Sequence, residues 1–361
     1  MKKQHFLIAI FLYSIAVLYL VATAPITPHE AKAFYTSHDV VATLMHWGDS
    51  LSPTLFGLRI FFVFLGFISI LFFYEYSRRY FPKREDAYLA TFIFMLLPGI
   101  VTGSTVANVA IIVLPLVLLF VLLYEKNHFT VLPFIMLALF FIHEASIIFF
   151  AALLLYGILY KDKKLSIFAT AFLLAFIYLA KGIEIGGRPS GHFIEIFGLY
   201  AAVFSPLVFF YFFYTMYRIF LREKKSLLWY ISFTALIVSL LLSVRQKINI
   251  TDFAPYVMIA IPLMLHTYHQ SLRVRLPQFK KKYILGFNVL MVSLLLSVLS
   301  MLIYNIMFYI SKNPSQYFSN IVYAPQILAK ELKSKGINCY DVRNESKRYQ
   351  LQYYNISQCT E

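Results

Sequence analysis

Residues that could hold or move a proton gather in a few stretches of this 361-residue chain. The first stretch, residues 25–39, carries His29, Glu30 and Asp39. Pro28 can begin a helix, and an acid suits the first turn of a helix. We therefore expect a surface-lying helix that directs its acids back toward the rest of the protein. The alternative is a plain amphipathic helix in which Glu30 only caps the N-terminus.

A second candidate is the adjacent pair His143 and Glu144, which interrupts the apolar stretch 131–160. That stretch is too long for one untilted membrane span and short for two. Two short spans with the pair at their outer tip would keep the carboxylate out of the hydrocarbon. We expect the pair to face a cavity. The alternative is a Glu that is satisfied by the neighbouring His and caps the following helix.

Three cations could hold a phosphate group. Arg245 and Lys247 directly follow an apolar run, and Arg188 lies in the Gly- and Pro-containing loop 186–191. Because Arg and Lys bind phosphate well, these three indicate a clamp for an anionic headgroup or a pyrophosphate-like group, and anchoring to lipid phosphates at the interface is the alternative. Arg59 lies near the start of another apolar run, where it either has a role in function or simply extends to the membrane surface.

The composition shows which kind of protein must position these residues. Hydrophobic residues make up 60% of the chain and charged residues only 14%, against about a quarter charged in soluble domains. This excludes a soluble enzyme, a disordered chain, a collagen-like fibre and a disulfide scaffold. The net charge of +15 does not indicate nucleic acid as a partner, because most of the charges fall in short loops between apolar runs.

The fold class predicted from these runs is an all-α polytopic membrane protein with about eleven transmembrane helices and a small α+β appendage. A span needs about 20 apolar residues. The predicted spans are 6–24, 55–76, 88–106, 108–124, 130–142, 145–160, 165–181, 197–220, 226–243, 253–270 and 283–311. They form a transmembrane domain, residues 1–311, whose first outer loop is 25–54.

Loop charges predict the orientation. With the N-terminus inside, nineteen Lys and Arg residues fall in inner loops, whereas the short outer loops hold five: Lys32, Lys181, Arg188, Arg245 and Lys247. Because basic residues favour the cytoplasmic side, the N-terminus is predicted to be cytoplasmic and the C-terminal tail outside, in a prokaryotic inner membrane. The first run also resembles a secretory signal ending in Ala22-Thr23-Ala24, but we expect a retained helix because ten spans follow.

The tail, residues 312–361, is polar and is predicted to form a separate α+β unit. Residues 324–335 predict an amphipathic helix, and residues 337–342 and 349–356 predict two strands. Both cysteines of the chain, Cys339 and Cys359, lie in this tail. In an oxidising compartment outside the cell we expect a disulfide between them, and two buried thiols are the alternative.

Motifs for metal or nucleotide chemistry are absent from the sequence. Ile147 stands where a zinc-protease His-Glu-x-x-His motif needs its second histidine, and no P-loop or dinucleotide-binding glycine pattern occurs. We therefore predict no metal site and no cofactor, although a requirement for a divalent ion stays open.

The order of these features resembles the GT-C fold of lipid-dependent glycosyltransferases. Relatives in that superfamily include protein O-mannosyltransferases, the aminoarabinose transferase acting on lipid A, and bacterial Rgt-type sugar transferases. The resemblance covers most of residues 1–270. It is carried by Pro28-His29-Glu30-Ala31, by Ser52 to Arg59, by Arg78-Arg79-Tyr80-Phe81, by Leu97-Pro98-Gly99, and by Arg245-Gln246-Lys247 with Pro255-Tyr256 and Pro262.

The resemblance implies an enzyme that moves a sugar from a polyprenyl-phosphate donor to an extracytoplasmic acceptor, which is a lipid, a glycan or a protein. Family members typically carry an Asp-Glu pair in the first outer loop, where this chain has His29-Glu30, and often a further acid in the second outer loop, where residues 103–108 have none. The implied base is Glu30, oriented by His29 or Asp39. The other implied roles are phosphate binding by Arg245 and Lys247 with help from Arg188, and a cavity lining formed by Arg59, His143 and Glu144.

Two other functions fit the same residues. A changed or missing base would leave a non-catalytic scaffold for envelope assembly, with the tail as its contact domain. A transporter or flippase for an anionic lipid-linked substrate is the second alternative, but we find no internal repeat between the halves of the chain.

Overall fold

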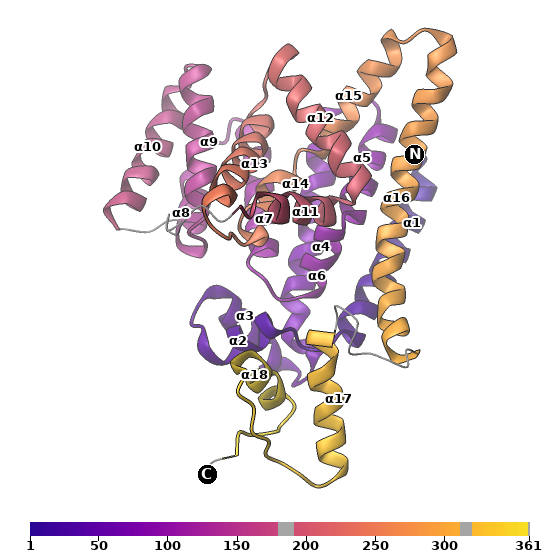
Figure 1. Ribbon diagram of the computed structural model, residues 1–361. Coiled ribbons are helices and arrows are strands. Elements are labelled where there is room, and N and C mark those ends of the chain that lie inside the picture. The colour runs from indigo at the N-terminus through magenta and orange to yellow at the C-terminus, as the bar shows by residue number, and fades with distance from the viewer. Residues whose placement is uncertain (180–190, 311–319, 360–361) are drawn as a thin grey trace. The chain divides into compact units, whose positions relative to one another are not determined.

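The computed structural model describes residues 1–179, 191–310 and 320–359, and its regular structure is helical (Figure 1). The chain divides into two units. The first unit contains residues 1–13, 65–102 and 109–298, and the second contains residues 14–64, 103–108 and 299–361. The outer segments that the sequence singles out are therefore divided between the units.

The first unit holds most of the apolar helices. Those that lie wholly within it are α5 (Arg84–Leu96), α7 (Ala110–Glu125), α8 (Leu132–Ile142), α9 (Ser146–Leu159), α10 (Lys163–Tyr178), α11 (Phe193–Phe204), α12 (Pro206–Arg222), α13 (Leu227–Arg245), the 3-10 turn η1 (Ile250–Asp252), α14 (Ala254–Met258) and α15 (Ile261–Val274). Within this unit α9 packs against α10 and α13, and α14 packs against α7 and α13.

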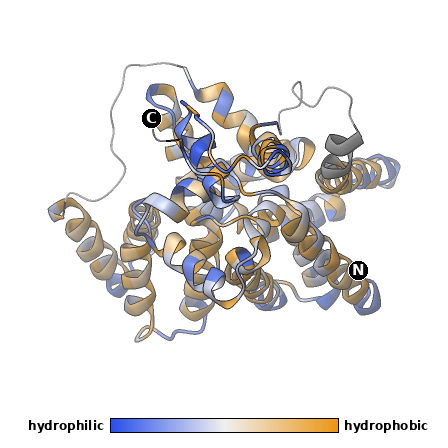
Figure 2. Cartoon of the chain, turned by 90° about the horizontal axis from the view of Figure 1, so that it is seen from below, coloured by the Kyte–Doolittle hydropathy of each residue, from blue (hydrophilic) through white to orange (hydrophobic). Residues whose placement is uncertain are grey.

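The second unit contains α2 (Pro28–Thr36), α3 (Val40–Leu51), α17 (Asn320–Ser334) and α18 (Glu345–Tyr353). The helices α1 (Lys3–Thr23), α4 (Leu55–Tyr80), α6 (Pro98–Thr105) and α16 (Pro277–Ile310) have residues in both units. Within the second unit α2 packs against α3 and α18, and α18 packs against α17. The hydropathy colouring of Figure 2 shows mostly orange helices, while the stretch near the C-terminus is largely blue.

The chain is an integral membrane protein, but fewer helices have the length of a span than the sequence predicts. Among the described residues, four helices are long and apolar enough to cross a membrane, α1, α4, α13 and the 277–303 part of α16, or up to six if each of two bent pairs is one span. The other apolar helices, such as α7, α8 and α9, are shorter.

Three of the predicted continuous spans are interrupted. The predicted span 88–106 bends by 60° between α5 and α6, and the predicted span 197–220 bends by 106° between α11 and α12. The predicted span 253–270 is divided into α14 and α15. Pro98 and Pro206 are the first residues of the helices that follow the two bends, and Pro262 is the second residue of α15. Proline lacks the N–H that would continue the preceding helix but fits the first turn of the next.

The two strands predicted in the tail are wrong. Residues 345–353 form α18, because the side chain of Asn344 accepts a hydrogen bond from the backbone N–H of Lys347 at 3.1 Å and caps the helix. Between the predicted strands only an isolated bridge joins Cys339 and Ser357 in the described residues. The tail is held together by a small buried cluster, which contains Ala329, Leu332, Leu351 and Ile356.

The structure joins Cys339 to Cys359 by a disulfide, with their Cα atoms 4.9 Å apart. The tail also packs on the first outer loop within the second unit. The backbone N–H of Ile26 donates to Tyr354 Oη at 3.2 Å, and Gln350 Nε2 donates to the carbonyl of Ile26 at 2.9 Å. The tail is therefore part of the unit that contains this loop.

Two glycines allow α3 to lie against the first turn of α4. Arg59 lies in the next turn of this helix. A Cβ atom on Gly57 would clash with the backbone carbonyl oxygens of Ser52 and Gly48, and a Cβ atom on Gly48 would clash with the carbonyl of Gly57. Backbone atoms cannot rotate away as a flexible side chain can. Glycine is thus required by the close approach of the two backbones.

We predict that Gly57→Ala lowers the thermal stability of the purified protein by about 1–3 kcal/mol, the usual cost of inserting a methyl group into a packed site. Gly286→Ala is the matched control, because Gly286 lies inside α16 with open space around it. The control is expected to be neutral or to gain up to about 1 kcal/mol from helix propensity. Equal melting temperatures for both variants in detergent would contradict the close approach.

Candidate functional site

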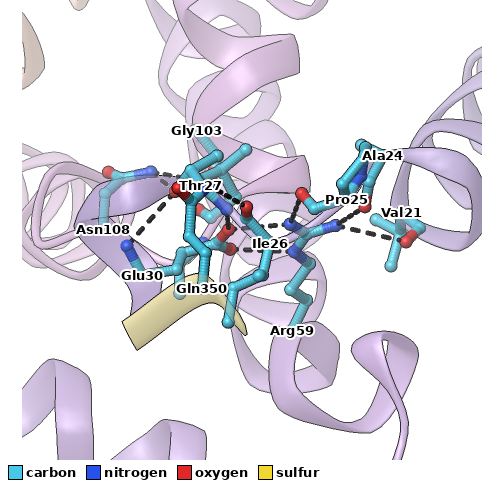
Figure 3. A network of polar contacts seen from close by, with 12 residues as sticks. Val21, Ala24, Pro25, Ile26, Thr27, Glu30, Arg59, Gly103, Asn108 and Gln350 are labelled. Carbon is cyan, nitrogen blue, oxygen red and sulfur yellow. Dashed lines mark hydrogen bonds and ion pairs between the residues drawn. The ribbon is translucent and has the colours of Figure 1, made fainter. Parts of the chain in front are cut away.

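The centre of the second unit is an ion pair between Glu30 and Arg59 (Figure 3). Glu30 lies in the first turn of α2, and Arg59 lies in the second turn of α4. Arg59 Nε donates to Glu30 Oε1 at 2.8 Å, and Nη2 donates to Oε2 at 2.7 Å. Both side chains are completely buried. This bidentate geometry is the strongest form of contact between arginine and a carboxylate.

Arg59 has acceptors for all five of its N–H donors. Nη1 donates to the carbonyls of Val21 at 3.3 Å and Ala24 at 2.8 Å, and Nη2 donates to the carbonyl of Pro25 at 2.8 Å in addition to its bond with Glu30. The acceptors at Val21, Ala24 and Pro25 lie near the C-terminal end of α1, where carbonyl groups lack partners within the helix. Arg59 thus links the end of α1 to the start of α2.

Glu30 is equally complete as an acceptor. Oε1 accepts from Arg59 and from the backbone N–H of Ala107 at 2.8 Å, and Oε2 accepts from Arg59 and from the N–H of Thr27 at 2.9 Å. Burial by itself raises the pKa of Glu30. The positive charge of Arg59 and the hydrogen bonds from Arg59, Thr27 and Ala107 outweigh burial and hold the pKa below its ordinary value of 4.5.

Local sequence explains why Glu30 lies where it does. The side chain of Thr27 accepts from the N–H of Glu30 at 3.2 Å, while Glu30 accepts from the N–H of Thr27, which together form a capping box. Pro28 fits the first position of α2. On the other side of the carboxylate, the Asn108 side chain donates to the carbonyl of Val106 at 2.8 Å and supports the turn that presents Ala107.

This geometry favours a different role for Glu30 and Arg59 from the one that the sequence predicts. A general base needs a free lone pair within reach of the proton that it takes, and the four acceptor positions of Glu30 are filled. Arg59 was expected to line a substrate cavity, but its guanidinium is enclosed and fully bonded. The pair is built to hold the backbone of the first outer loop.

The other predicted residues of this loop are exposed. His29 lies beside Glu30 on α2 but is exposed to solvent. Asp39 is also exposed and caps α3, where its Oδ1 accepts from the N–H of Ala42 at 2.9 Å. The role predicted for His29 and Asp39, to orient Glu30, remains a prediction.

A second polar cluster lies in the first unit and joins two of its loops. His143 ends α8, and its Nε2 lies 3.5 Å from Oδ1 of Asp252 in the turn η1. Glu144 is exposed and contributes to the electrostatic environment of Asp252. Ser146 Oγ and Tyr256 Oη, both fully buried and 3.1 Å apart, fix the start of α9 against α14 and so bring these loops together.

The two members of this cluster are shifted toward their neutral forms. Burial is the main cause that raises the pKa of Asp252 to about 6, and the charge of Glu144 adds to it, while hydrogen bonds from Thr251 and Asn249 oppose the shift. Burial lowers the pKa of His143 to about 4, against a hydrogen bond with the backbone of Asp252. A carboxylate that titrates near neutral pH suits proton transfer.

The predicted phosphate-binding cations fall into three cases. Lys247 Nζ lies 3.3 Å from Glu195, which also lies 3.0 Å from His192 Nδ1. Arg245 ends α13 on the same loop as Asp252. Arg188 lies outside the described residues. Lys247 is exposed by 69%, so its ion pair with Glu195 can exchange for another anion.

Asp252 is the residue that sequence reasoning leaves without a role. Its signal was its position, five residues after Lys247 and three before Pro255, in a loop already marked by basic residues. Its partner lies more than one hundred residues away in the chain, so the sequence alone does not show the pairing. Within residues 1–179, 191–310 and 320–359, no group of three His, Cys, Asp or Glu residues is placed to hold a metal ion.

We predict that Glu30→Gln destabilises the protein by about 3–5 kcal/mol, because it leaves the buried charge of Arg59 without a partner. The matched control is Glu75→Gln, which removes a carboxylate from a partly exposed ion pair with Arg78 and Arg79. The control is expected to cost at most about 1 kcal/mol. Thermal unfolding in detergent measures both, and a Glu30→Gln protein as stable as the control would contradict the clamp.

The fold of this chain is similar to that of a solved membrane protein, although its sequence has no recognised relative. No protein-family model matches the sequence, and no curated protein matches it either. The crystal structure of ArnT from Cupriavidus metallidurans in the apo state is similar, with a TM-score of 0.60 and 12% identity, over 98% of this chain and 84% of the ArnT chain. ArnT is an aminoarabinose transferase with the GT-C fold. At this identity the likeness shows the fold alone, and the chain has the polytopic GT-C fold that its sequence resembles.

Proposed function

We propose that the protein is a membrane glycosyltransferase that moves a sugar from a polyprenyl-phosphate donor to an acceptor outside the cytoplasm. The observation that carries the proposal is the ArnT-like fold over 98% of the chain. The polar cluster of the first unit adds to it, because a carboxylate with a raised pKa lies on the same loop as two cations. The acceptor is a lipid, a glycan or a protein.

Asp252 is the base in this proposal. Its pKa of about 6 leaves it mostly ionised at neutral pH, yet basic enough to take a proton from an acceptor hydroxyl. The acceptor oxygen forms a bond to the anomeric carbon while the bond from that carbon to the phosphate oxygen breaks. The phosphate leaves with the bonding electrons, and the hydroxyl proton goes to Asp252. One base and no covalent intermediate give inversion at the sugar. His143 orients the carboxylate.

Arg245 and Lys247 are proposed to stabilise the leaving lipid phosphate. Negative charge grows on the bridging oxygen as the glycosidic bond breaks, and cations that are already in place lower the energy of that state. The exposed Lys247 can release Glu195 and turn to a phosphate with little cost, because a surface ion pair contributes about 0–1 kcal/mol. Arg188 remains a further candidate for binding this phosphate.

Glu30 and Arg59 are positioning residues in this proposal. They fix the first outer loop, which carries His29 and Asp39 on exposed surfaces. His29 stands where the family has its aspartate and is therefore the second candidate for the base. Asp39 already serves as the cap of α3, which leaves it the weakest of the three.

The proposed location is a prokaryotic inner membrane, with the N-terminus in the cytoplasm and the C-terminal tail outside. The distribution of Lys and Arg over the short loops supports this orientation. The disulfide between Cys339 and Cys359 also supports it, since such bonds persist in oxidising compartments.

We predict that Asp252→Asn lowers the turnover of labelled polyprenyl-phosphate sugars by about 10²–10⁴-fold, the usual contribution of a general base. The matched control is Asp86→Asn, which removes the carboxylate of another His–Asp pair, 3.3 Å from His269, with similar exposure. The control is expected to keep wild-type turnover. Donor loss in proteoliposomes measures both.

A series of His29→Asn and Glu30→Gln variants completes that experiment. Loss of turnover in folded His29→Asn, with Asp252→Asn unaffected, would move the base to His29. Folded wild-type protein that consumes none of the donors would contradict the enzyme and favour a scaffold or a flippase.

A further inference from the structure

A cavity of about 380 Å³ lies in the first unit, at the C-terminal ends of α12 and α15. It has no part in the proposed sugar transfer, because α12 and α15 lead away from the loops that carry His143 and Asp252. Its lining contains three arginines, a serine and two tyrosines: Arg218, Arg222, Arg275, Ser271, Tyr214 and Tyr217. The chemistry of this lining is that of an anion site.

Two of the arginines are held in place by neighbouring side chains. Arg218 Nη1 donates to Ser271 Oγ at 2.5 Å, and its Nε lies 3.3 Å from Glu223. The guanidinium of Arg275 lies 4.0 Å from the centre of the Tyr283 ring. An arginine that is already ordered loses less entropy when it binds a ligand, so the cavity is prepared for an anion.

The charge of the cavity is positive. Three guanidinium groups line it, and Glu223 beside Arg218 offsets one of them. Guanidinium groups match phosphate in shape and form paired hydrogen bonds with it. Tyrosine and serine hydroxyls can donate to the remaining phosphate oxygens. A phosphate group is therefore the ligand chemistry that fits the polar part of the cavity.

An apolar stripe leads out of the cavity along α12. Phe210, Tyr214, Tyr217 and Leu221 are exposed by 55%, 49%, 56% and 56%, and their spacing of four, three and four residues places them on one helix face. A soluble phosphate compound has no apolar part that could pack against this stripe. The acyl chains of a phospholipid can lie along the stripe while its phosphate enters the cavity.

We propose that this cavity binds the phosphate of an anionic phospholipid, with the acyl chains along the α12 stripe. In the predicted orientation the cavity lies at the cytoplasmic leaflet, where anionic headgroups attract basic residues. Because the site is separate from the sugar-transfer loops, the proposal does not depend on the proposed function. Orientation of the protein in the membrane would by itself explain basic residues at the cytoplasmic ends of these helices. It would explain neither the ordered cavity nor the apolar stripe.

The test is native mass spectrometry of the purified full chain in detergent. The probes are phosphatidylglycerol, phosphatidylcholine with the same acyl chains, and glycerol 3-phosphate. Wild-type protein is expected to retain phosphatidylglycerol, and the Arg222→Gln/Arg275→Gln double variant is expected to bind it at least about tenfold more weakly. Both substituted side chains are exposed, so the variant should fold, which an unchanged melting temperature verifies.

The matched control is the Arg78→Gln/Arg79→Gln variant, which removes the same charge from exposed arginines at the end of α4. It is expected to keep wild-type binding of phosphatidylglycerol. Equal retention of phosphatidylcholine, or equal weakening by both double variants, would overturn the proposal. Displacement of the lipid by glycerol 3-phosphate at similar concentration would show that a free phosphate compound is the ligand and would overturn the lipid assignment.

Discussion

The buried ion pair of Glu30 and Arg59 determines the arrangement of the second unit. Removing two charges from water is costly, and a pair of this kind is tolerated only if every remaining donor and acceptor is satisfied. Here each of the five N–H groups of Arg59 and each acceptor position of Glu30 has a partner. The partners come from the end of α1, the start of α2, the turn at 103–108 and the first part of α4. Any of these segments that moved would leave a buried charge unsatisfied, so the pair fixes all four together.

Two carboxylates of this protein, those of Glu30 and Asp252, differ in how their surroundings affect the pKa. Glu30 is stabilised as an anion by Arg59 and by backbone N–H groups, which makes it a weak base. Asp252 is partly buried, and burial together with the charge of Glu144 raises its pKa to about 6. In the proposed function, Glu30 therefore holds the first outer loop and Asp252 takes the proton of the acceptor hydroxyl.

Apolar patterning predicted helices at most of the correct places, because a run of apolar residues is what a membrane helix requires. The predicted span 55–76 falls within α4, and the predicted span 226–243 begins at the cap of α13 and otherwise lies within it. The bend at Ser205, where φ is +75°, was missed because a hydropathy window averages across a single proline or serine. The strand predicted at 349–356 was wrong for a different reason. The alternation of polar and apolar residues was given more weight than the helix-capping signal of Asn344.

The site was predicted in its residue types but not in its contacts. Glu30 and Arg59 were singled out because charges are rare in an apolar chain, yet their pairing depends on how α2 meets α4. The capping box of Thr27 and Glu30 has a sequence signature, Thr-x-x-Glu, that was overlooked. The backbone N–H of Ala107 has none, because only the fold brings it to Glu30. Asp252 stood in the right loop, but its raised pKa comes from burial and from Glu144, both of which depend on the fold.

The measurement that tests this account most directly is the pH dependence of donor turnover by the wild-type protein. A base must be deprotonated to act, so the rate is lost as the pH falls through its pKa. The account predicts an acidic inflection near pH 6, which belongs to Asp252 and is absent from the residual rate of Asp252→Asn. A rate that stays constant from neutral pH down to pH 4.5, the ordinary pKa of a glutamate, would contradict the account and return the role of base to Glu30.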